Sequence, residues 1–188
     1  MSLLDFVFQT AIQGGTFSPE VDVSKNYKHW ISQKDERRCV DCKDLHGKIW
    51  PLDEDPEPEP ALHTNCRCVI EPMESIKAGT ATINKTDGAD WTLKQEEDLP
   101  DYYITIEDIY NLGWEKGMNP IDYAPGKMIT GGIYQNRNGH LPQKDERTWH
   151  EADINYRQGK RNSQRIVWSN DGLIFVTYDH YETFHEIV

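Results

Sequence analysis

Two pairs of cysteines constrain the fold of this chain more than any other feature. Cys39 and Cys42 are separated by two residues, Cys66 and Cys68 by one, and His63 precedes the second pair. Thiolates and imidazoles are the ligands that Zn²⁺ prefers, and a structural zinc site uses four of them. The chain offers five such groups. We therefore expect a zinc site built from four of Cys39, Cys42, His63, Cys66 and Cys68.

The stretch between the pairs, Pro51–Pro60, alternates prolines with acidic residues. Prolines and like charges disfavour both helix and strand, so we expect an extended loop. A structural zinc ion contributes about 10–16 kcal/mol in small peptides, which is enough to order a segment with little core. Two alternatives remain open: two disulfides, or four reduced thiols. A chain without a secretion signal favours zinc over disulfides.

The overall composition excludes some classes of protein. No apolar run reaches the roughly 18 residues that span a bilayer, so we expect no membrane partner. The stretch Met1–Phe8 contains Asp5 and lacks a basic region, so we expect no signal peptide. A cytoplasmic protein fits this reading. The net charge of −12, taken alone, disfavours nucleic-acid binding.

Charge and composition change along the chain. Residues 1–98 carry a net charge of −8 and residues 99–188 only −4. Residues 72–98 have few apolar positions, whereas aromatic and β-branched residues become frequent from Leu99 onward. We divide the chain into a Cys/His fragment at 1–72, a linker with a poorly formed first helix at 73–98, and a folded domain at 99–188.

The last ninety residues have the pattern of an α+β fold. Thr105, with Asp108 three residues on and Gly113 at the end, predicts a capped helix over Thr105–Leu112. Asn170-Asp171-Gly172 is a strong hairpin signal between two strands. Helix first and antiparallel strands afterwards indicate the α+β class. The predicted strands are Thr148–Tyr156, Arg165–Ser169, Leu173–Thr177 and Tyr181–Val188.

Chemically active side chains gather on these predicted strands and turns. Alternate residues of a strand share a face, so Glu151 and Asp153 lie together, opposite Ala152 and Ile154. Arg161 and Arg165 follow at the next turn and strand, and His180 falls at a later turn. If the strands are neighbours, one carboxylate, one imidazole and two guanidiniums converge.

That set of groups suits phosphodiester transfer to an adjacent hydroxyl. A carboxylate takes the 2′-OH proton, the oxygen attacks phosphorus, and an imidazolium protonates the departing 5′ oxygen. Two arginines bind the phosphate and stabilise the charge of the transition state. No metal or other cofactor is required for catalysis. The internal 2′-OH nucleophile restricts such cleavage to RNA.

Seven motifs follow one another in this half of the chain. They are Leu99-Pro-Asp-Tyr-Tyr-Ile-Thr, Leu112-Gly-Trp, Ala124-Pro-Gly-Lys, Asn136-Arg-Asn-Gly-His-Leu-Pro, Arg147-Thr-Trp-His-Glu-Ala-Asp-Ile-Asn-Tyr, Gly159-Lys-Arg-Asn-Ser-Gln-Arg-Ile and Thr177-Tyr-Asp-His-Tyr-Glu-Thr-Phe. In this order they resemble the barnase-like family of bacterial guanyl-preferring ribonucleases, densely from Leu99 to Val188 and weakly back to Ile83. The resemblance implies the microbial ribonuclease fold, in which short N-terminal helices pack on a five-stranded antiparallel sheet.

The resemblance implies catalytic roles for four residues. Glu151 occupies the position of the general base and His180 that of the general acid. Arg161 and Arg165 occupy the positions of the phosphate-binding arginines. The family's active-site lysine is replaced by Ile106. Because the loss of one charge-stabilising donor typically costs about 10²–10³ in rate, we expect reduced activity.

The resemblance also implies the residues that contact substrate. Asn136 and Arg137 fall in the guanine-recognition loop, and Tyr181 beside the substrate cleft. Asn138 replaces the glutamate with which the family reads guanine. An amide oxygen accepts hydrogen bonds from guanine without charge assistance, so we expect a weaker guanine preference. Asp153 matches a buried carboxylate that holds the two arginines.

The Cys/His fragment resembles a second family. Asp35-Glu-Arg-Arg-Cys-Val-Asp-Cys, Gly47-Lys-Ile-Trp-Pro-Leu and Leu62-His-Thr-Asn-Cys-Arg-Cys are similar to the C-terminal end of phage Mu F-type minor head (head morphogenesis) proteins, over about residues 30–72. The pairing of the two resemblances is typical of toxins in which a nuclease is fused to a phage-derived element. The partners it implies are RNA, a barstar-like inhibitor protein, and phage head or delivery components.

Two other functions fit the sequence. The first is a phage structural or interaction protein whose ribonuclease fold has lost catalysis through Ile106. The second is a zinc-dependent nucleic-acid binder that uses the cysteine cluster, which the net charge of that half disfavours.

Overall fold

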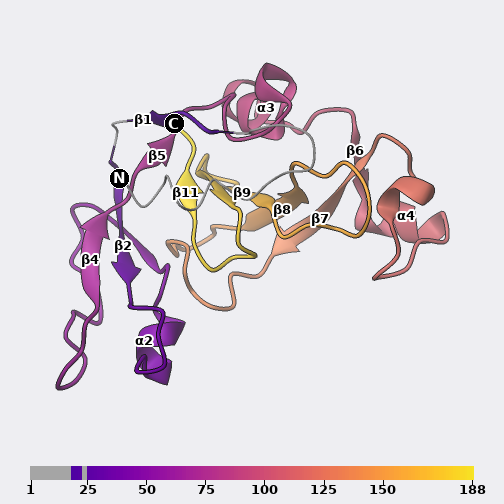
Figure 1. Ribbon diagram of the computed structural model, residues 1–188. Helices are drawn as coiled ribbons and strands as arrows, with labels where there is room; N and C mark the ends of the chain where they lie inside the picture. Colours follow the sequence, from indigo (N-terminus) through magenta and orange to yellow (C-terminus); the bar gives the residue numbers. More distant parts are fainter. Residues whose placement is uncertain (1–17, 23–24) are drawn as a thin grey trace.

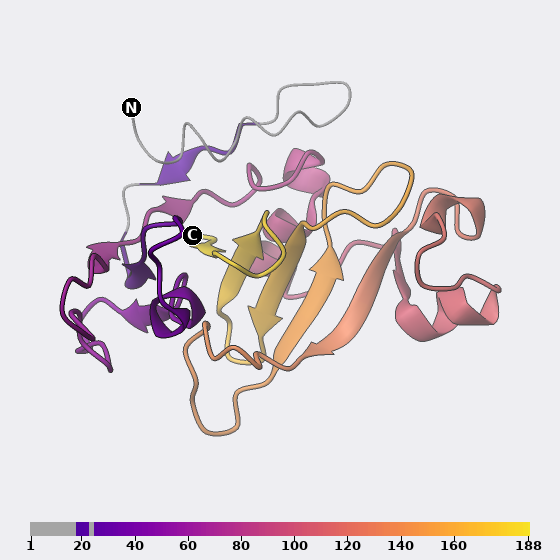
Figure 2. The same ribbon diagram turned by 60° about the horizontal axis from the view of Figure 1, so that its bottom comes forward.

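The computed structural model describes residues 18–22 and 25–188, and its largest element is a six-stranded sheet (Figures 1 and 2). The order across the sheet is β11-β10-β9-β8-β7-β6. Neighbouring strands are antiparallel except β6 and β7, which are parallel. The strands are β6 (Tyr103–Thr105), β7 (Met128–Tyr134), β8 (Trp149–Asp153), β9 (Arg165–Ser169), β10 (Ile174–Thr177) and β11 (His185–Glu186).

The α+β class is confirmed, but the expected count of five antiparallel strands is wrong. Strands β7 to β11 are antiparallel, and β6 adds a sixth, parallel strand at the edge. This strand holds only three residues and ends where a helix begins, so it has no alternation that a sequence pattern could reveal. Parallel pairing is possible because the long connection through residues 106–127 carries the chain back to the start of β7.

Local sequence explains the hairpin and the helix that were expected. β9 and β10 are joined by Asn170-Asp171-Gly172, where Gly172 has a φ of 91°, a conformation that glycine adopts without strain. Helix α4 (Ile106–Asn111) begins after Thr105, whose hydroxyl accepts a hydrogen bond from the Asp108 amide at 3.0 Å. Both predictions are confirmed.

The large sheet buries side chains on both faces. On one face Ala152, Ile154 and Ile166 pack under helix α3 (Ala89–Glu96) and its residue Leu93. On the other face Trp149, Val167 and Phe175 form a second cluster. Alternation along β8 therefore separates Ala152 from Trp149 and Glu151, as the sequence predicts. Two short 3-10 helices, η1 (Lys85–Asp87) and η2 (Pro120–Asp122), complete this part.

Residues 73–98, expected as a linker, contribute to the core. Ile76 and Ala81 are fully buried, and Leu93 is 4% exposed. The buried carboxylate of Asp90 accepts hydrogen bonds from the amides of Gly79 and Ala81 and from the Thr82 hydroxyl. This one side chain organises a segment that has few apolar residues. The division of the chain at 72 and 98 stays a prediction.

The N-terminal part forms two small sheets. We call residues 27–72 the Cys/His region. It contains a sheet in the order β3-β2-β4 and the short helix α2, and the acidic stretch after Pro51 has neither helix nor strand, as predicted. The second small sheet pairs β1 with β5. The elements are β1 (Val21–Asp22), β2 (Tyr27–Ile31), α2 (Val40–Asp44), β3 (Ile49–Pro51), β4 (Val69–Pro72) and β5 (Ser75–Ile76).

The Cys/His region packs beside the β11 edge of the large sheet (Figure 2). Its residues Tyr27 and Ile49 belong to the same buried cluster as Phe175 and Phe184. Just before β2, Asn26 Nδ2 donates to Glu186 Oε2 of β11 at 2.9 Å, a contact between residues 160 apart in the chain. Within the described ranges, no helix has the length and apolar content to cross a membrane.

Candidate active site and Cys/His cluster

A buried ion cluster lies at the end of β8. Asp153, 1% exposed, is the cross-strand partner of Arg165 in β9. Arg161 donates from Nε and Nη2 to the two carboxylate oxygens at 2.8 and 2.6 Å, and Arg165 Nε lies 3.0 Å from Oδ1. A buried carboxylate requires such partners, because an unpaired charge in the interior is costly. Asp153 thus holds both arginines, as the sequence predicts for this position.

Glu151 stands two residues earlier on the same face of β8. Tyr181 donates from its hydroxyl to Glu151 Oε2 at 2.6 Å and stacks on Tyr134, with ring centroids 5.1 Å apart. The strand beneath is irregular: the register of β7 shifts between Thr130 and Gly132. A Cβ at Gly131 would lie 2.7 Å from Glu151 Oε1, so glycine makes room for the carboxylate. β-Bulges of this kind commonly re-aim side chains beside active sites.

The hydrogen bond to Glu151 affects the pKa of the Tyr181 hydroxyl. Burial, followed by the hydrogen bond to Glu151, raises the pKa of Tyr181. The positive charges of Arg165 and Arg161 act in the opposite direction and lower this pKa. Tyr181 therefore stays protonated near neutral pH and remains a donor to Glu151.

His180 and Tyr181 occupy a strained turn. Their φ values of 63° and 68° lie in the left-handed region, which costs energy for residues other than glycine. The turn is held by the His180 amide donating to Ser163 O at 3.1 Å and the Tyr181 amide donating to Thr177 Oγ1 at 2.9 Å. These contacts fix where the exposed imidazole of His180 stands.

The loop between β7 and β8 contains the three residues expected to recognise guanine. Asn136 is 4% exposed; its Nδ2 donates to Leu141 O, and its Oδ1 accepts from the Leu141 amide. Its side chain therefore shapes the loop from within. Arg137 and Asn138 are exposed, and Asn138 Nδ2 donates to Tyr181 O at 3.4 Å.

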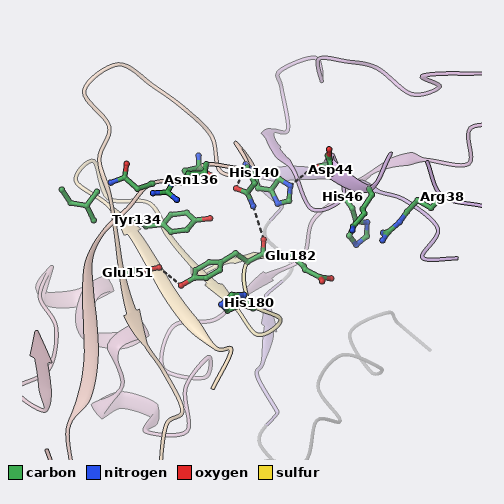
Figure 3. Close-up of a pocket in the computed structure, with 15 residues that line it drawn as sticks. Arg38, Asp44, His46, Tyr134, Asn136, His140, Glu151, His180 and Glu182 are labelled. Carbon is green, nitrogen blue, oxygen red and sulfur yellow. Dashed lines mark hydrogen bonds between the residues drawn. The ribbon is translucent and has the colours of Figure 1, made fainter. Parts of the chain in front are cut away.

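One pocket of about 830 Å³ brings most of these residues together (Figure 3). It is lined by Glu151, His180 and Tyr181, and by the loop residues Asn136–Asn138. Arg161, Arg165 and Asp153 are outside its lining. Ile106, which stands where the family has its active-site lysine, packs against the apolar cluster of Ile109 and Trp114.

Sequence reasoning missed part of this pocket. Arg38, Lys43, Asp44 and His46 line it from the Cys/His region, and His140 and Glu182 line it from the large-sheet side. The contact between the two regions joins residues about a hundred positions apart, for example His140 Nε2 and Asp44 O at 2.9 Å. Local periodicity and motif spacing contain no signal for such a contact.

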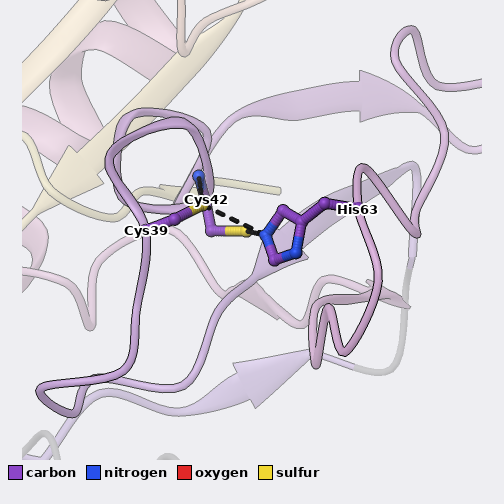
Figure 4. Close-up of side chains that lie close together, drawn as sticks. All are labelled: Cys39, Cys42 and His63. Carbon is purple, nitrogen blue, oxygen red and sulfur yellow. Dashed lines mark hydrogen bonds between the residues drawn. The ribbon is translucent and has the colours of Figure 1, made fainter.

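Three of the predicted metal ligands, Cys39, Cys42 and His63, lie close together at the start of α2 (Figure 4). His63 Nε2 lies 3.2 Å from Cys39 Sγ and 3.3 Å from Cys42 Sγ, and Cys42 Sγ lies 3.7 Å from Cys66 Sγ. Cys42, Cys66 and Cys68 form a second close group, and all four cysteines are free thiols. Tetrahedral zinc, with ligands at about 2.0–2.3 Å, requires donor separations of this size. The donor set therefore fits zinc.

Glu151 and His180 line one pocket, and two guanidiniums are held on Asp153, two residues along the strand from Glu151. These groups match the chemistry of enzymes that cleave phosphodiesters by acid–base catalysis. A ribonuclease family model matches residues 77–188, well over half of the chain. The chain belongs to the ribonuclease family, and this membership supports cleavage of RNA as its activity. Residues 7–71 match a second model, described as phage Mu protein F like protein. Both expected resemblances are confirmed, with wider limits; residues 7–17 and 23–24 of the second lie outside the described residues.

Individual relatives agree with the family. The ribonuclease of Heyndrickxia coagulans is 50% identical over 110 residues, which cover 57% of this chain and 99% of that protein. The guanyl-specific ribonuclease St of Saccharopolyspora erythraea is 38% identical over 87 residues, covering 46% of this chain and 80% of that protein. The solved structure of ribonuclease Sa2 with guanosine-2'-cyclophosphate is 34% identical, covers 31% of this chain and 63% of that one, and has a TM-score of 0.29.

Proposed function

We propose that this protein is an endoribonuclease that cleaves single-stranded RNA by metal-independent transesterification. The observation that carries the proposal is the pocket in which Glu151 and His180 meet, backed by the Asp153 cluster. Glu151 is the general base and His180 the general acid. Arg161 and Arg165 stabilise the charge on the phosphate, and Asp153 positions them.

The reaction needs only these groups and the substrate. Glu151 accepts the proton of the 2′-OH as that oxygen attacks phosphorus, and the bond from phosphorus to the 5′ oxygen breaks. His180, as imidazolium, gives its proton to the leaving 5′ oxygen. The product ends in a 2′,3′-cyclic phosphate, which water then opens slowly to a 3′-phosphate. The hydrogen bond from Tyr181 keeps the Glu151 carboxylate directed into the pocket.

A preference for guanine is part of the proposal. The similarity to a guanyl-specific relative supports it, as does the closed loop that Asn136 forms beside the pocket. Arg137 and Asn138 lie at the rim of the pocket, where a base stacked near Tyr181 would meet them. The preference is weaker than that of a site with a glutamate, because Asn138 contributes no charge.

The Cys/His region is proposed to hold one structural zinc ion through four of its five donors. When bound, the ion would cross-link α2 to the loop that carries His63, Cys66 and Cys68. It supplies fold stability and no step of catalysis. Cys39 also caps α2, accepting a hydrogen bond from the Cys42 amide.

The biological setting follows from the second family match. A ribonuclease joined to a phage-derived element is best explained as a toxin module, associated with phage or prophage and delivered to target cells. A barstar-like acidic inhibitor is the expected protein partner, since the cleft contains arginines. A second candidate is a phage structural protein that retains a weakened ribonuclease fold, which the apolar packing of Ile106 favours.

An RNA cleavage assay in EDTA tests the proposal. Purified protein should cut single-stranded RNA and leave 2′,3′-cyclic phosphate ends, detected by mass spectrometry. Glu151→Gln and His180→Ala should each lower kcat/KM by about 10²–10⁴, the usual contribution of a general base or acid. Glu107→Gln, on the exposed side of α4, is the matched control and should change nothing. Equal cleavage by the wild type and by Glu151→Gln would refute the proposed roles, and no cleavage by any of them would favour the structural protein.

A further inference from the structure

The pocket has two walls, and only one of them comes from the ribonuclease-like part. Glu151, Tyr134 and the recognition loop form the first wall. The second is formed by the segment 38–47, which contains α2 and the turn after it and lies across the pocket from Glu151 (Figure 3). This segment belongs to the part of the chain that matches the phage Mu F model.

Hydrogen bonds attach this second wall to the recognition loop. Within the wall, Asp44 O lies 2.9 Å from His140 Nε2. Two residues after the wall, the Ile49 amide donates to His140 O at 2.8 Å. His140 is only 6% exposed, so water competes little with these bonds. The wall is therefore fixed relative to the base-recognition loop.

Close backbone packing attaches the same wall to the turn that carries His180. A Cβ at Gly47 would lie 1.9 Å from Glu182 O, so the two backbones touch at a position that only glycine allows. Lys34 Nζ pairs with Glu182 Oε2 at 2.8 Å beside this contact. The segment 38–47 thus touches both the recognition loop and the catalytic turn.

The charges of the wall suit an anion. Burial, aided by the charges of Lys34 and Arg38, lowers the pKa of His46 to about 4, so this imidazole is neutral near pH 7. Its Nδ1 accepts a hydrogen bond from the Ser32 amide. Arg38 and Lys43 are then the two cations of the wall. Glu182 is paired with Lys34, which leaves Asp44 as the acid beside these two cations.

We propose that Arg38 and Lys43 form a phosphate-binding subsite for the RNA backbone, on the side of the recognised nucleotide away from the cleaved bond. Figure 3 shows Arg38 and His46 across the pocket from Glu151, with His140 of the recognition loop between them. RNA that continues on the 5′ side of the recognised nucleotide can therefore run toward this wall. Arg38 donates from Nη1 to Ser32 Oγ, which orients the guanidinium and leaves other donors for phosphate. The Cys/His region is then part of the RNA site. This inference rests on the proposed ribonuclease function.

Substrates of two lengths test the subsite. One is a guanine-containing dinucleotide with no phosphate 5′ of the guanosine, and the other carries four further nucleotides on its 5′ side. The double variant Arg38→Gln/Lys43→Gln should raise KM for the longer RNA about tenfold, the effect of losing one or two charge-assisted hydrogen bonds. It should leave kcat and KM for the dinucleotide unchanged. The salt dependence of binding the longer RNA should also fall, by up to about 1.4 in the slope of log K against log salt for two lost contacts.

The matched control is Arg37→Gln/Lys116→Gln, which removes the same two charges from exposed positions outside the pocket. It should behave as the wild type. Thermal unfolding of each variant shows whether the fold is kept, and Arg38→Lys should retain much of the binding. Equal KM values for the long RNA in the wild type and the double variant would overturn the inference.

Fluorescence anisotropy separates this inference from the proposed catalysis. Labelled long RNA is titrated with Glu151→Gln protein, with and without the two wall substitutions. If the wild type does not cleave RNA but the wall substitutions still weaken RNA binding, the catalytic proposal is refuted and the subsite is kept. If the wild type cleaves the dinucleotide but the wall substitutions change neither the KM for the long RNA nor its binding, the catalytic proposal is kept and the subsite is refuted.

Discussion

The two regions of this molecule obtain stability in different ways. The large sheet buries apolar side chains on both faces, and the cluster under α3 contains no residue of the Cys/His region. The Cys/His region has three strands of five residues or fewer, five sulfur and nitrogen donors, and apolar residues that are covered partly by the other region. A phage-type segment that would have little core alone has therefore become part of a larger one. The pocket lies where the two regions meet.

The buried ion cluster of the large sheet provides the largest expected difference between the regions. Asp153→Asn should lower the free energy of unfolding by about 3–5 kcal/mol, because it leaves two guanidiniums without their buried partner. Asp35 forms a geometrically similar pair with Arg67 in the Cys/His region, but both side chains are about a third exposed. Asp35→Asn should have a far smaller effect, since solvent screens exposed pairs.

Urea denaturation of the two variants makes this comparison. Equal losses in the free energy of unfolding would mean that the burial of the ion pair does not determine how much its carboxylate stabilises the protein. Asp153→Asn should also lower cleavage through the arginines.

A substitution at the contact between the regions should have an intermediate effect. Gly47→Ala adds a Cβ that meets Glu182 O and forces a left-handed conformation on alanine, so we expect a loss of about 2–4 kcal/mol. Gly172→Ala has a similar φ but open space around the added atom, so about 1–2 kcal/mol is expected. Thermal or urea unfolding measures both. A Gly47 variant no less stable than the Gly172 variant would show that the two backbones separate freely.

Acid should affect the Cys/His region through its histidines. Burial lowers the pKa of His29 and of His46 to about 4 in the folded protein, whereas an unfolded histidine titrates near 6.5. Between these values the unfolded state binds more protons, so stability should fall as the pH drops from about 6.5 to 4. The titratable groups whose charge acts on the pKa of His29 are His185 and His46. Those that act on the pKa of His46 are Lys34, Arg38, Glu182 and Asp179.

Urea denaturation midpoints at pH 7 and at pH 4.5 measure this loss of stability in acid. The double variant His29→Gln/His46→Gln should lose less stability between the two pH values than the wild type. Carboxylates titrate in the same way in both proteins, so the difference between them isolates the histidines. Identical pH dependence would exclude the two histidines as its source.

Local features of the sequence were sufficient for much of the large sheet. The Thr105 cap, the Asn170-Asp171-Gly172 turn and the alternation around Glu151 each specify a short piece of backbone, and each is present. The pairing of Asp153 with both arginines also agrees with expectation. The catalytic and binding roles of the site residues stay predictions.

What the sequence could not provide are contacts between distant segments. The edge strand β6 is defined by its pairing with β7, and three residues give no period to detect. Residues 73–98 look like a linker by composition, yet Asp90 ties them together with three hydrogen bonds. The wall formed by Arg38 and Lys43 depends on the contacts of Gly47 with Glu182 and of Asp44 with His140, which join residues far apart in the chain and which no local pattern encodes.

The contact between Asn26 and Glu186 has a consequence for how the chain is made. At about 5–20 residues per second, a ribosome needs roughly 10–30 s to synthesise the 160 residues between them. During that interval the apolar side chains Tyr27 and Ile49 lack Phe175 and Phe184, against which they pack in the folded protein. Its donor residues, Cys39 to Cys68, are all made within a short stretch and can chelate an ion early. The second wall of the pocket contacts His140 and Glu182, so the pocket can be completed only after Glu182 has been synthesised.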